Sequence, residues 1–511
     1  MKKLNYIQGA FILTLTNLIT GVLAFVFRIL LSRSIGAEGV GVYQLVLPLY
    51  ILFITLVSGG ITTAVSKLIA EQQTKSNYRN MHKIVKICCT LIGAWSILIA
   101  TLLSFNADFV AQYILKDMRT LYSIIIFTPA IVFISISAII RGYFFGLQDV
   151  NPPAIIDVVE KIIRLGGLIL AVKLMLPLGI AYVCAGAMLA MAAGELVSMV
   201  LLWMLYIKKR RKGSRETSTD STFSIINRIL RNALPLSVSG ALTTIMEMLC
   251  AVIVPAQLIA AGFNKQSSLS LYGELTGMAM PLLFFPFIII VSLGITLVPA
   301  ITSAYTAKNY AVLNHQCDNA IKIAAVLGLG STALFGTFPT QLSDIFFKCP
   351  QAGNLLFWLS ICCVFQYLQF TLFAISNGLG LQSKVLGYSI INVVILVLCS
   401  YILIPMPRIN IYGYIIGVNI STVLIVLKNT ADLKKLKQLK FRLIRPMIRP
   451  FISFAVMLFT LRFVYESIRL LHTANLALLI SIIAGFAAYI AALMITRTFT
   501  LRQISNTLSL K

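Results

Sequence analysis

The sequence contains very little charge for its length. Only 11% of its 511 residues are charged, and 16 acidic residues stand against 42 Lys and Arg. A soluble protein of this length needs a polar surface, so the scarcity of charge and a mean hydropathy of +0.92 exclude a set of soluble domains. The chain is therefore expected to lie in a membrane.

Residues that carry chemistry in enzymes are also scarce. The chain has three histidines and nine scattered cysteines, no CxxC pair and no GxxxxGK[ST] phosphate loop. No Ser/His/Asp or paired-carboxylate group can be placed outside the apolar segments. We therefore expect no metal site, no catalytic residue and no cofactor, and a transporter is favoured over an enzyme.

Long apolar runs recur along the whole chain. A helix needs about 20 apolar residues to cross the hydrocarbon layer. These runs are continuous rather than alternating, which predicts an all-α bundle and not a β-barrel. Fourteen spans are expected, at residues 8–31, 42–65, 84–105, 121–140, 154–175, 178–206, 232–260, 275–300, 319–340, 352–378, 385–404, 410–428, 450–468 and 475–496. The first follows Met1-Lys2-Lys3 without a convincing cleavage site and is interpreted as a retained helix.

The positive charge is distributed unevenly between alternate loops. The densest runs, KKRRKGSR at 208–215 and KKLKQLKFRLIRPMIR at 434–449, fall on the same predicted side as both tails. This bias predicts that both termini are cytoplasmic, with anionic membrane lipids as partners of the basic runs. The runs lack the interleaved aromatic residues of a base-stacking surface, so no nucleic-acid partner is expected.

The chain contains an internal repeat at an offset of 234 residues. FITLVSGGIT at 53–62 matches FIIIVSLGIT at 287–296, and GLQ at 146–148 matches GLQ at 380–382. The offset spans six helices and preserves their orientation, which indicates two parallel repeats. The expected division is an N-terminal lobe at 1–206, a basic linker at 207–231, a C-terminal lobe at 232–428, a basic loop at 429–449, and two further helices with a tail at 450–511.

One predicted span carries four closely spaced charges where apolar residues are expected. Asp157, Glu160, Lys161 and Arg164 follow NPP at 151–153, a run typical of a helix start in which Asn caps the helix. Placing a charged side chain that deep in a membrane costs free energy. Either the pairs Asp157–Lys161 and Glu160–Arg164 neutralise each other at i,i+4 spacing, or the charges face a water-filled functional cavity.

Four more charged residues lie in or beside apolar spans. Arg28 is near the outer end of the first span, where it could also snorkel outward, and Arg141 is at the cytoplasmic mouth of the fourth. Glu195 and Glu247 are central in the sixth and seventh spans, next to the junction of the two halves. They are candidates for coupling to H⁺ or Na⁺, with a neutral, hydrogen-bonded carboxyl as the alternative.

Several stretches resemble a known family. The similarity spans both halves and is carried by TGVLAFVFRILLSRSIGAEGVGVYQL at 20–45, GGITTAVSKLIAE at 59–71, IIRGYFFGLQDVNPPAI at 139–155 and LYGELTGMAMPLLFFPFIIIVSLGITLVPAIT at 271–302. These stretches resemble the stage V sporulation protein B family of the multidrug/oligosaccharidyl-lipid/polysaccharide exporter superfamily. The resemblance implies fourteen helices in two lobes, a central cavity and alternating access.

The resemblance also implies a substrate and a site. The substrate would be an undecaprenyl-diphosphate-linked saccharide, a lipid II-type precursor for spore cortex peptidoglycan. The protein would lie in the cell membrane around the forespore, with peptidoglycan polymerases as further partners. The family motifs place cavity arginines that contact the diphosphate at Arg28 and Arg141, and depth in the membrane adds Arg164. The alternatives are a cation-coupled drug exporter, a membrane-embedded glycosyltransferase or polymerase, and a non-transporting scaffold.

Overall fold

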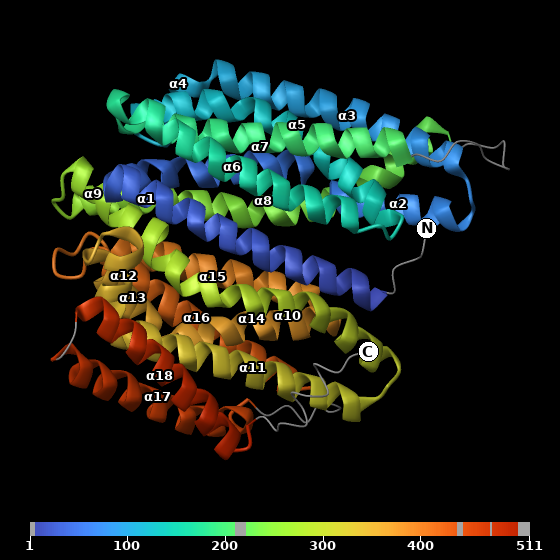
Figure 1. Ribbon diagram of the computed structural model, residues 1–511. Coiled ribbons are helices and arrows are strands. Elements are labelled where there is room, and N and C mark those ends of the chain that lie inside the picture. Colours follow the sequence, from blue (N-terminus) through green and yellow to red (C-terminus); the bar gives the residue numbers. More distant parts are fainter. Residues whose placement is uncertain (1–5, 210–220, 437–442, 471–472, 499–511) are drawn as a thin grey trace. The chain divides into compact units, whose positions relative to one another are not determined.

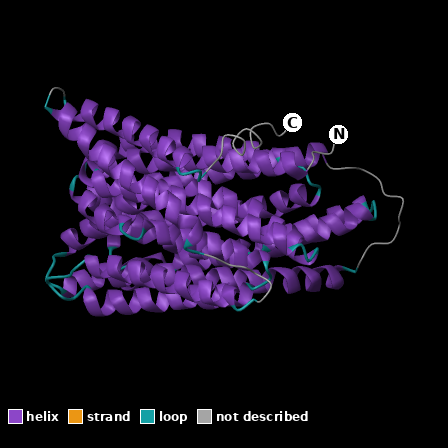
Figure 2. Ribbon diagram, turned by 90° about the horizontal axis from the view of Figure 1, so that it is seen from below, coloured by secondary structure: helices purple, strands orange, loops and turns teal. Residues whose placement is uncertain are grey.

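The computed structural model describes residues 6–209, 221–436, 443–470 and 473–498. Every regular element in those ranges is a helix, as Figure 2 shows, so the predicted all-α fold is confirmed. The centre of the basic linker at 210–220, part of the basic loop at 437–442 and both tails lie outside the described residues. His472, one of the three histidines, also lies outside them.

The chain forms two compact units, Met1–Gly273 and Glu274–Lys511. In the first unit, α6 packs against both α7 and α1, and α5 packs against α7 (Figure 1). The helices of this unit are α1 (Tyr6–Ser58), α2 (Ile61–Thr74), α3 (Tyr78–Phe105), α4 (Ala107–Phe109), η1 (Val110–Ile114), η2 (Met118–Thr120), α5 (Leu121–Gly146), α6 (Asn151–Met175), η3 (Leu176–Leu178), α7 (Ile180–Lys209), α8 (Thr222–Ala260) and α9 (Lys265–Gly273).

The second unit is built from the remaining helices. Here α17 packs against α18 and α11, and α15 packs against α16. Its helices are η4 (Glu274–Ala279), α10 (Met280–Thr306), α11 (Tyr310–Thr337), α12 (Pro339–Phe347), α13 (Gln351–Ser360), α14 (Cys363–Gly378), α15 (Gln382–Leu403), α16 (Tyr412–Lys434), α17 (Arg445–Arg469) and α18 (Ala474–Ile495).

The first two predicted spans form one long helical run. In place of the loop expected over residues 32–41, α1 continues to a single break at Gly36, where φ is 66° and ψ is −175°. That conformation is accessible almost only to glycine, so one residue suffices to redirect the helix. The chain needs no extended loop between the two segments.

The described residues contain eleven helices that are long and apolar enough to cross a membrane. The number rises to twelve if α13 and α14, which meet at a 56° bend, count as one span. Helix α6 is not among them, because it carries the four charges noted in the sequence. The protein is therefore an all-helical, multi-pass membrane protein, and the count of fourteen stays a prediction.

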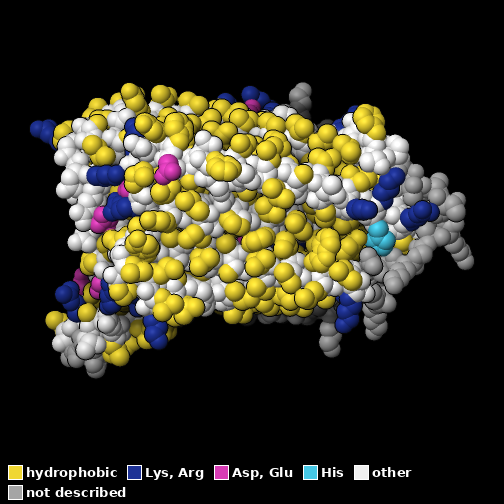
Figure 3. Space-filling view, turned by 90° about the horizontal axis from the view of Figure 1, so that it is seen from above, with side chains coloured by type: hydrophobic (Ala, Val, Ile, Leu, Met, Phe, Trp, Pro, Cys, Tyr) yellow, Lys and Arg dark blue, Asp and Glu magenta, His cyan; other side chains and the backbone are white. Residues whose placement is uncertain are grey.

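The surface has the character of a membrane protein. Apolar side chains cover the middle of the helices, and Lys and Arg gather toward the helix ends (Figure 3). Large apolar side chains on α3 are widely exposed, among them Trp95 at 42% and Ile97 at 56%. A continuous apolar surface of this kind is favourable only where lipid, rather than water, covers it.

Candidate functional site

Helix α6 brings the charged cluster into the first unit. The helix begins at Asn151 with Pro152 and Pro153 in its first turn, where a missing N–H costs nothing because it has no intrahelical acceptor. The predicted helix start is confirmed, but the predicted cap is wrong: Val150 occupies that position and no side chain caps the helix. Helix α6, which carries the four charged residues, packs against α1 and α7.

Arg164 is held between two carboxylates. Its Nη2 contacts Glu160 four residues earlier on α6 and also donates a 3.0 Å hydrogen bond to Glu195 of α7. All three groups are largely buried, with side-chain exposures of 15% for Arg164, 2% for Glu160 and 12% for Glu195. The predicted i,i+4 pair between Glu160 and Arg164 is therefore confirmed, with an additional partner from another helix.

The second predicted pair, between Asp157 and Lys161, is wrong. Lys161 instead donates to Glu160 at 2.7 Å, and Asp157 lies 2.7 Å from Arg141 of α5. Arg141 also donates to the hydroxyl of Ser198 at 3.2 Å. Spacing along α6 allowed the Asp157–Lys161 pair, but the fold brings the guanidinium of Arg141 on α5 within reach of Asp157.

A cavity of about 120 Å³ opens beside this cluster within the first unit. Its polar wall consists of Arg28 and Tyr43 from α1 and Lys161 and Arg164 from α6. The hydroxyl of Tyr43 donates to the sulfur of Met191 on α7 at 3.3 Å. The remaining lining residues are apolar: Leu23, Ala24, Phe27, Leu47 and Met191. Lys161 and Arg164 thus line a cavity, and all four closely spaced charges of α6 form ion pairs. The water-filled functional cavity stays a prediction.

Arg28 differs from the other cations of the cluster. Among the residues that the structure describes, it has no acidic partner, although it is partly buried in the cavity wall. The cluster contains four cations, Arg28, Arg141, Lys161 and Arg164, against the three carboxylates Asp157, Glu160 and Glu195. One positive charge is left over beside the cavity, which is the arrangement of an anion-binding site.

The other sequence candidates lie outside the cavity wall. Arg141 and Glu195 contact the cluster without lining the cavity. Glu247 of α8 is exposed and makes no ion pair with any described residue, so it does not join this cluster. Tyr43 and Met191 were missed by sequence reasoning, because an aromatic or a methionine in an apolar helix carries no signal of its own.

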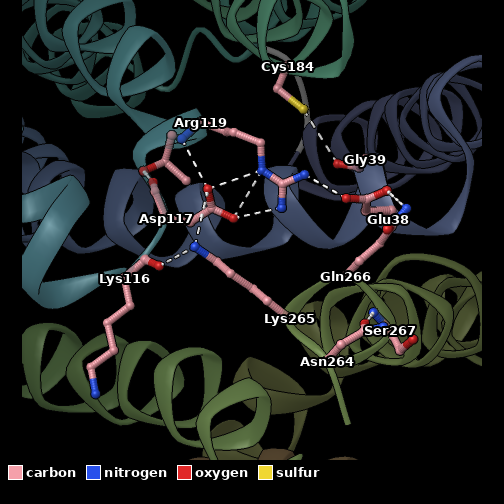
Figure 4. Close-up of polar contacts among 11 residues, drawn as sticks. Glu38, Gly39, Lys116, Asp117, Arg119, Cys184, Asn264, Lys265, Gln266 and Ser267 are labelled. Carbon is pink, nitrogen blue, oxygen red and sulfur yellow. Dashed lines mark hydrogen bonds and ion pairs between the residues drawn. The ribbon is translucent and has the colours of Figure 1, made fainter. Parts of the chain in front are cut away.

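A second polar cluster joins α1, the η2 segment and α9, as Figure 4 shows. Arg119 pairs with Glu38 at 2.6 Å and with Asp117 at 2.8 Å, and Gln266 donates to Glu38 at 2.8 Å. Lys265 donates to the carbonyl of Lys116 at 2.7 Å, and its Nζ lies 3.8 Å from Asp117. We call Glu38, Asp117, Arg119, Lys265 and Gln266 the latch cluster. Sequence reasoning missed it, because charges at helix ends are common and give no indication of their partners.

Asp117 is the buried centre of the latch cluster, with 3% of its side chain exposed. Burial alone raises the pKa of this carboxyl, but hydrogen bonds from Arg119 and the charges of Arg119 and Lys265 hold the pKa below its usual value. A depressed folded-state pKa stabilises the fold above the unfolded-state pKa of about 3.9, and that contribution is lost as the pH falls through the folded-state pKa. The contribution of Asp117 to stability is therefore fully present at neutral pH.

Two glycines let the backbones meet beside the latch cluster. A Cβ on Gly41 would lie 2.0 Å from the carbonyl oxygen of Leu269, and a Cβ on Gly273 would lie 2.1 Å from that of Ala37. Such distances are far below van der Waals contact, so any side chain at either position would force α1 and α9 apart. Contact between these helices thus depends on glycine at both positions.

Arg119→Ala is expected to lower the free energy of unfolding by on the order of 2 kcal/mol, because it leaves buried Asp117 without its main hydrogen-bond donor. Thermal unfolding in detergent measures this loss. The matched control is Lys116→Gln, a neighbouring cation that uses only its backbone carbonyl in the cluster. Unfolding temperatures that are equal in the Arg119→Ala variant and wild type would show that the latch cluster does not hold these elements together.

The described residues hold no group of three or more His, Cys, Asp or Glu side chains arranged to bind a metal. All nine cysteines are free thiols. The chemistry available at the cavity is therefore that of guanidinium, ammonium, carboxyl and phenol groups, which bind and release ions and protons.

Comparisons with known proteins identify a family and a fold for this chain. A family model described as polysaccharide biosynthesis protein matches residues 6–305. Stage V sporulation protein B of Bacillus subtilis (strain 168) is 29% identical over 446 residues, which cover 87% of this chain and 86% of that protein. The lipid II flippase MurJ of the same strain is 27% identical over 415 residues, covering 76% and 75%. A solved structure of lipid II flippase MurJ in an inward closed conformation shares the fold, with a TM-score of 0.73 at 14% identity over 94% of this chain and 98% of that one.

Proposed function

The chain belongs to the polysaccharide biosynthesis protein family, and from this premise we propose that it moves an undecaprenyl-diphosphate-linked saccharide across the cell membrane. The family is one of transporters and not of enzymes, within the multidrug/oligosaccharidyl-lipid/polysaccharide exporter superfamily. The cargo is proposed to be a lipid II-type precursor, because two relatives carry the names lipid II flippase MurJ and stage V sporulation protein B. Spore cortex synthesis is the proposed context.

The observation that carries the proposal is the excess positive charge beside the cavity. Arg28 lines it without an acidic partner among the described residues, next to Lys161 and Arg164. A diphosphate that crosses an apolar layer needs partners that stay charged and donate several hydrogen bonds. Guanidinium groups meet both needs, because they remain protonated and donate in a planar fork. The undecaprenyl tail would meanwhile remain in lipid.

The same charge argues against the main rival. A drug exporter that takes lipophilic cations would need a cavity with excess negative charge, and here cations exceed carboxylates by one. The cavity therefore favours an anionic cargo. The H⁺ or Na⁺ coupling expected for such exporters is not required for this proposal.

We propose fourteen membrane crossings with both termini in the cytoplasm. The eleven candidate spans become fourteen when Ile12–Thr74 is counted as two crossings, the bent pair Gln351–Gly378 as one, and α6 is added. The 63 residues of Ile12–Thr74 would extend about 95 Å as a helix, roughly three times the thickness of the hydrocarbon layer, so a single crossing is too short for them. The division into lobes at 1–206 and 232–428 belongs to the same proposal.

Alternating access gives the latch cluster a function in this proposal. The bias of Lys and Arg toward alternate loops puts the Gly36 break, Asp117 and Lys265 on the outer side of the membrane. On that side, the latch cluster would close the path to the exterior by joining α1, η2 and α9. Release of the cargo outward would require these contacts to separate.

Purified protein in proteoliposomes is expected to move fluorescent lipid II between leaflets, measured as the fraction of fluorescence that an external quencher reaches over time. Fluorescent phosphatidylcholine, which has a phosphate but no net charge, is the control cargo. Protein-free liposomes provide the background rate. Equal movement of both lipids, or of neither in protein shown to be folded, would contradict the proposed function.

A further inference from the structure

Arg164 forms ion pairs with two carboxylates, and one of them is held in place more firmly than the other. Glu160 is on the same helix, is only 2% exposed, and also accepts a 2.7 Å hydrogen bond from Lys161. It packs closely against Gly194, where an added Cβ would lie 3.4 Å from its Cγ. Glu160 is therefore fixed by its own helix, by Lys161 and by α7.

Glu195 is held much less firmly. It comes from α7, and its one ion pair with a described residue is the 3.0 Å contact with Arg164. A carboxylate with a single partner from a neighbouring helix can leave that partner without dismantling a network. Of the two anions on Arg164, Glu195 is thus the exchangeable one.

Arg164 also retains unused capacity to bind an anion. Its Nε is buried and has no hydrogen-bond partner among the described residues, while its side chain lines the cavity. Both carboxylates instead converge on Nη2. An anion that enters the cavity could therefore engage Arg164 together with Arg28, in competition with Glu195.

The groups around Glu195 offer no second cation to its carboxylate. Those that interact electrostatically with it are Tyr50 of α1, Arg141 of α5, and Glu160, Lys161 and Arg164 of α6. Asp157 neutralises Arg141, and Glu160 neutralises Lys161. If the Glu195 carboxylate were displaced from Arg164, no unpaired cation near it would balance its charge. The hydroxyl of Tyr50 is neutral at working pH and cannot do so either.

The charge balance of the cluster implies that binding of a diphosphate is accompanied by uptake of a proton. The cluster has four cations and three carboxylates, a balance of one positive charge. A diphosphate diester brings two negative charges and would leave the cluster with one uncompensated negative charge in a largely buried site, which is costly. Protonation of one carboxyl restores neutrality, and the displaced carboxyl is the one that has lost its cation.

We propose that Glu195 is an internal competitor of the transported anion: the diphosphate displaces the Glu195 carboxylate from Arg164, and the displaced carboxyl takes up one proton. The proton is taken up as H⁺ from bulk solvent, forms an O–H bond on Glu195, and is returned to solvent when the anion leaves and Arg164 recaptures the carboxylate. This inference rests on the proposed function, and it makes Glu195 a residue that weakens binding at rest and couples release to re-formation of an ion pair.

The test measures binding of farnesyl-diphosphate-linked N-acetylglucosamine to the purified full-length protein between pH 6 and pH 8. This probe is a diphosphate diester, so it lacks the ionisation near pH 6 that a phosphate monoester shows. Uptake of one proton predicts that Kd increases with pH, toward about tenfold per pH unit in wild type. Glu195→Gln should bind more tightly than wild type at pH 8 and lose the pH dependence. Glu195→Asp, which keeps a titratable group, should retain it.

The matched control is Glu466→Gln, which removes an exposed carboxyl on α17 and should behave as wild type. Binding by wild type without pH dependence, or an unchanged slope in Glu195→Gln, would overturn the inference and leave the proposed function standing. Failure of wild type to bind the probe at any pH would instead contradict the proposed function, and the inference with it. Unfolding temperatures show whether each variant is folded.

Discussion

Replacing Arg28 by Ala is expected to reduce lipid II translocation by roughly 100-fold or more, because loss of one partner of a desolvated charge pair costs about 2–5 kcal/mol. Arg28 supplies the excess positive charge of the cavity and has no acidic partner among the described residues. Its removal therefore leaves no carboxylate unpaired, and we expect the variant to unfold at nearly the wild-type temperature. The quencher assay in proteoliposomes measures the rate.

Two further variants sharpen the interpretation of Arg28. Arg28→Lys keeps the charge but loses the planar fork, so an intermediate rate is expected. Lys208→Ala removes an exposed cation at the end of α7 and should leave the rate unchanged. If Arg28→Ala transported lipid II at the wild-type rate, the cavity assignment would be wrong.

Of the substitutions proposed for this protein, Arg164→Ala is expected to lower the free energy of unfolding the most. It leaves Glu160 and Glu195 buried together without the cation they share, and breaking a buried ion pair in this way costs about 3–5 kcal/mol. Glu160 keeps Lys161 at 2.7 Å, so most of the cost falls on Glu195. A marked fall in unfolding temperature should therefore accompany loss of transport.

A double variant separates the two effects. Arg164→Met with Glu195→Gln removes one charge of each sign and leaves Glu160 paired with Lys161. Replacing a buried ion pair by uncharged groups of similar volume is close to neutral for stability, so the unfolding temperature should recover most of the loss. Transport should remain absent, because the guanidinium is still missing. Recovery of both properties would mean that Arg164 acts in folding alone.

The local features of the fold could be predicted because they depend on short stretches of sequence. Apolar runs identified the helices, and NPP located the start of α6 within one residue. The break in α1 was expected as a longer loop. A single glycine in an unusual conformation replaces that loop, and hydropathy cannot distinguish a break of one residue from one of ten.

Some of the residues around the cavity could be predicted from the sequence, but their pairing could not. Arg28, Lys161 and Arg164 do line one cavity, because charge placed deep in an apolar helix needs water or a partner. Spacing along α6 suggested the wrong partner for Asp157, and it contained no information about Tyr43, Met191 or the latch cluster. Those contacts join residues that are tens to hundreds of positions apart.

By itself, the sequence determined that this is an all-helical membrane protein and that charged residues interrupt the apolar runs of its first half. Hydropathy and helix-start signals act over one or two turns, so they can be recognised without knowledge of the remaining chain. Only the tertiary structure decided that Arg164 pairs with two carboxylates and that Arg28 has no acidic partner among the described residues. It also decided that α9 packs directly against the backbone of α1 at Gly41. Those outcomes depend on how each helix is rotated and packed against its neighbours, which is set by the sum of many contacts between distant segments.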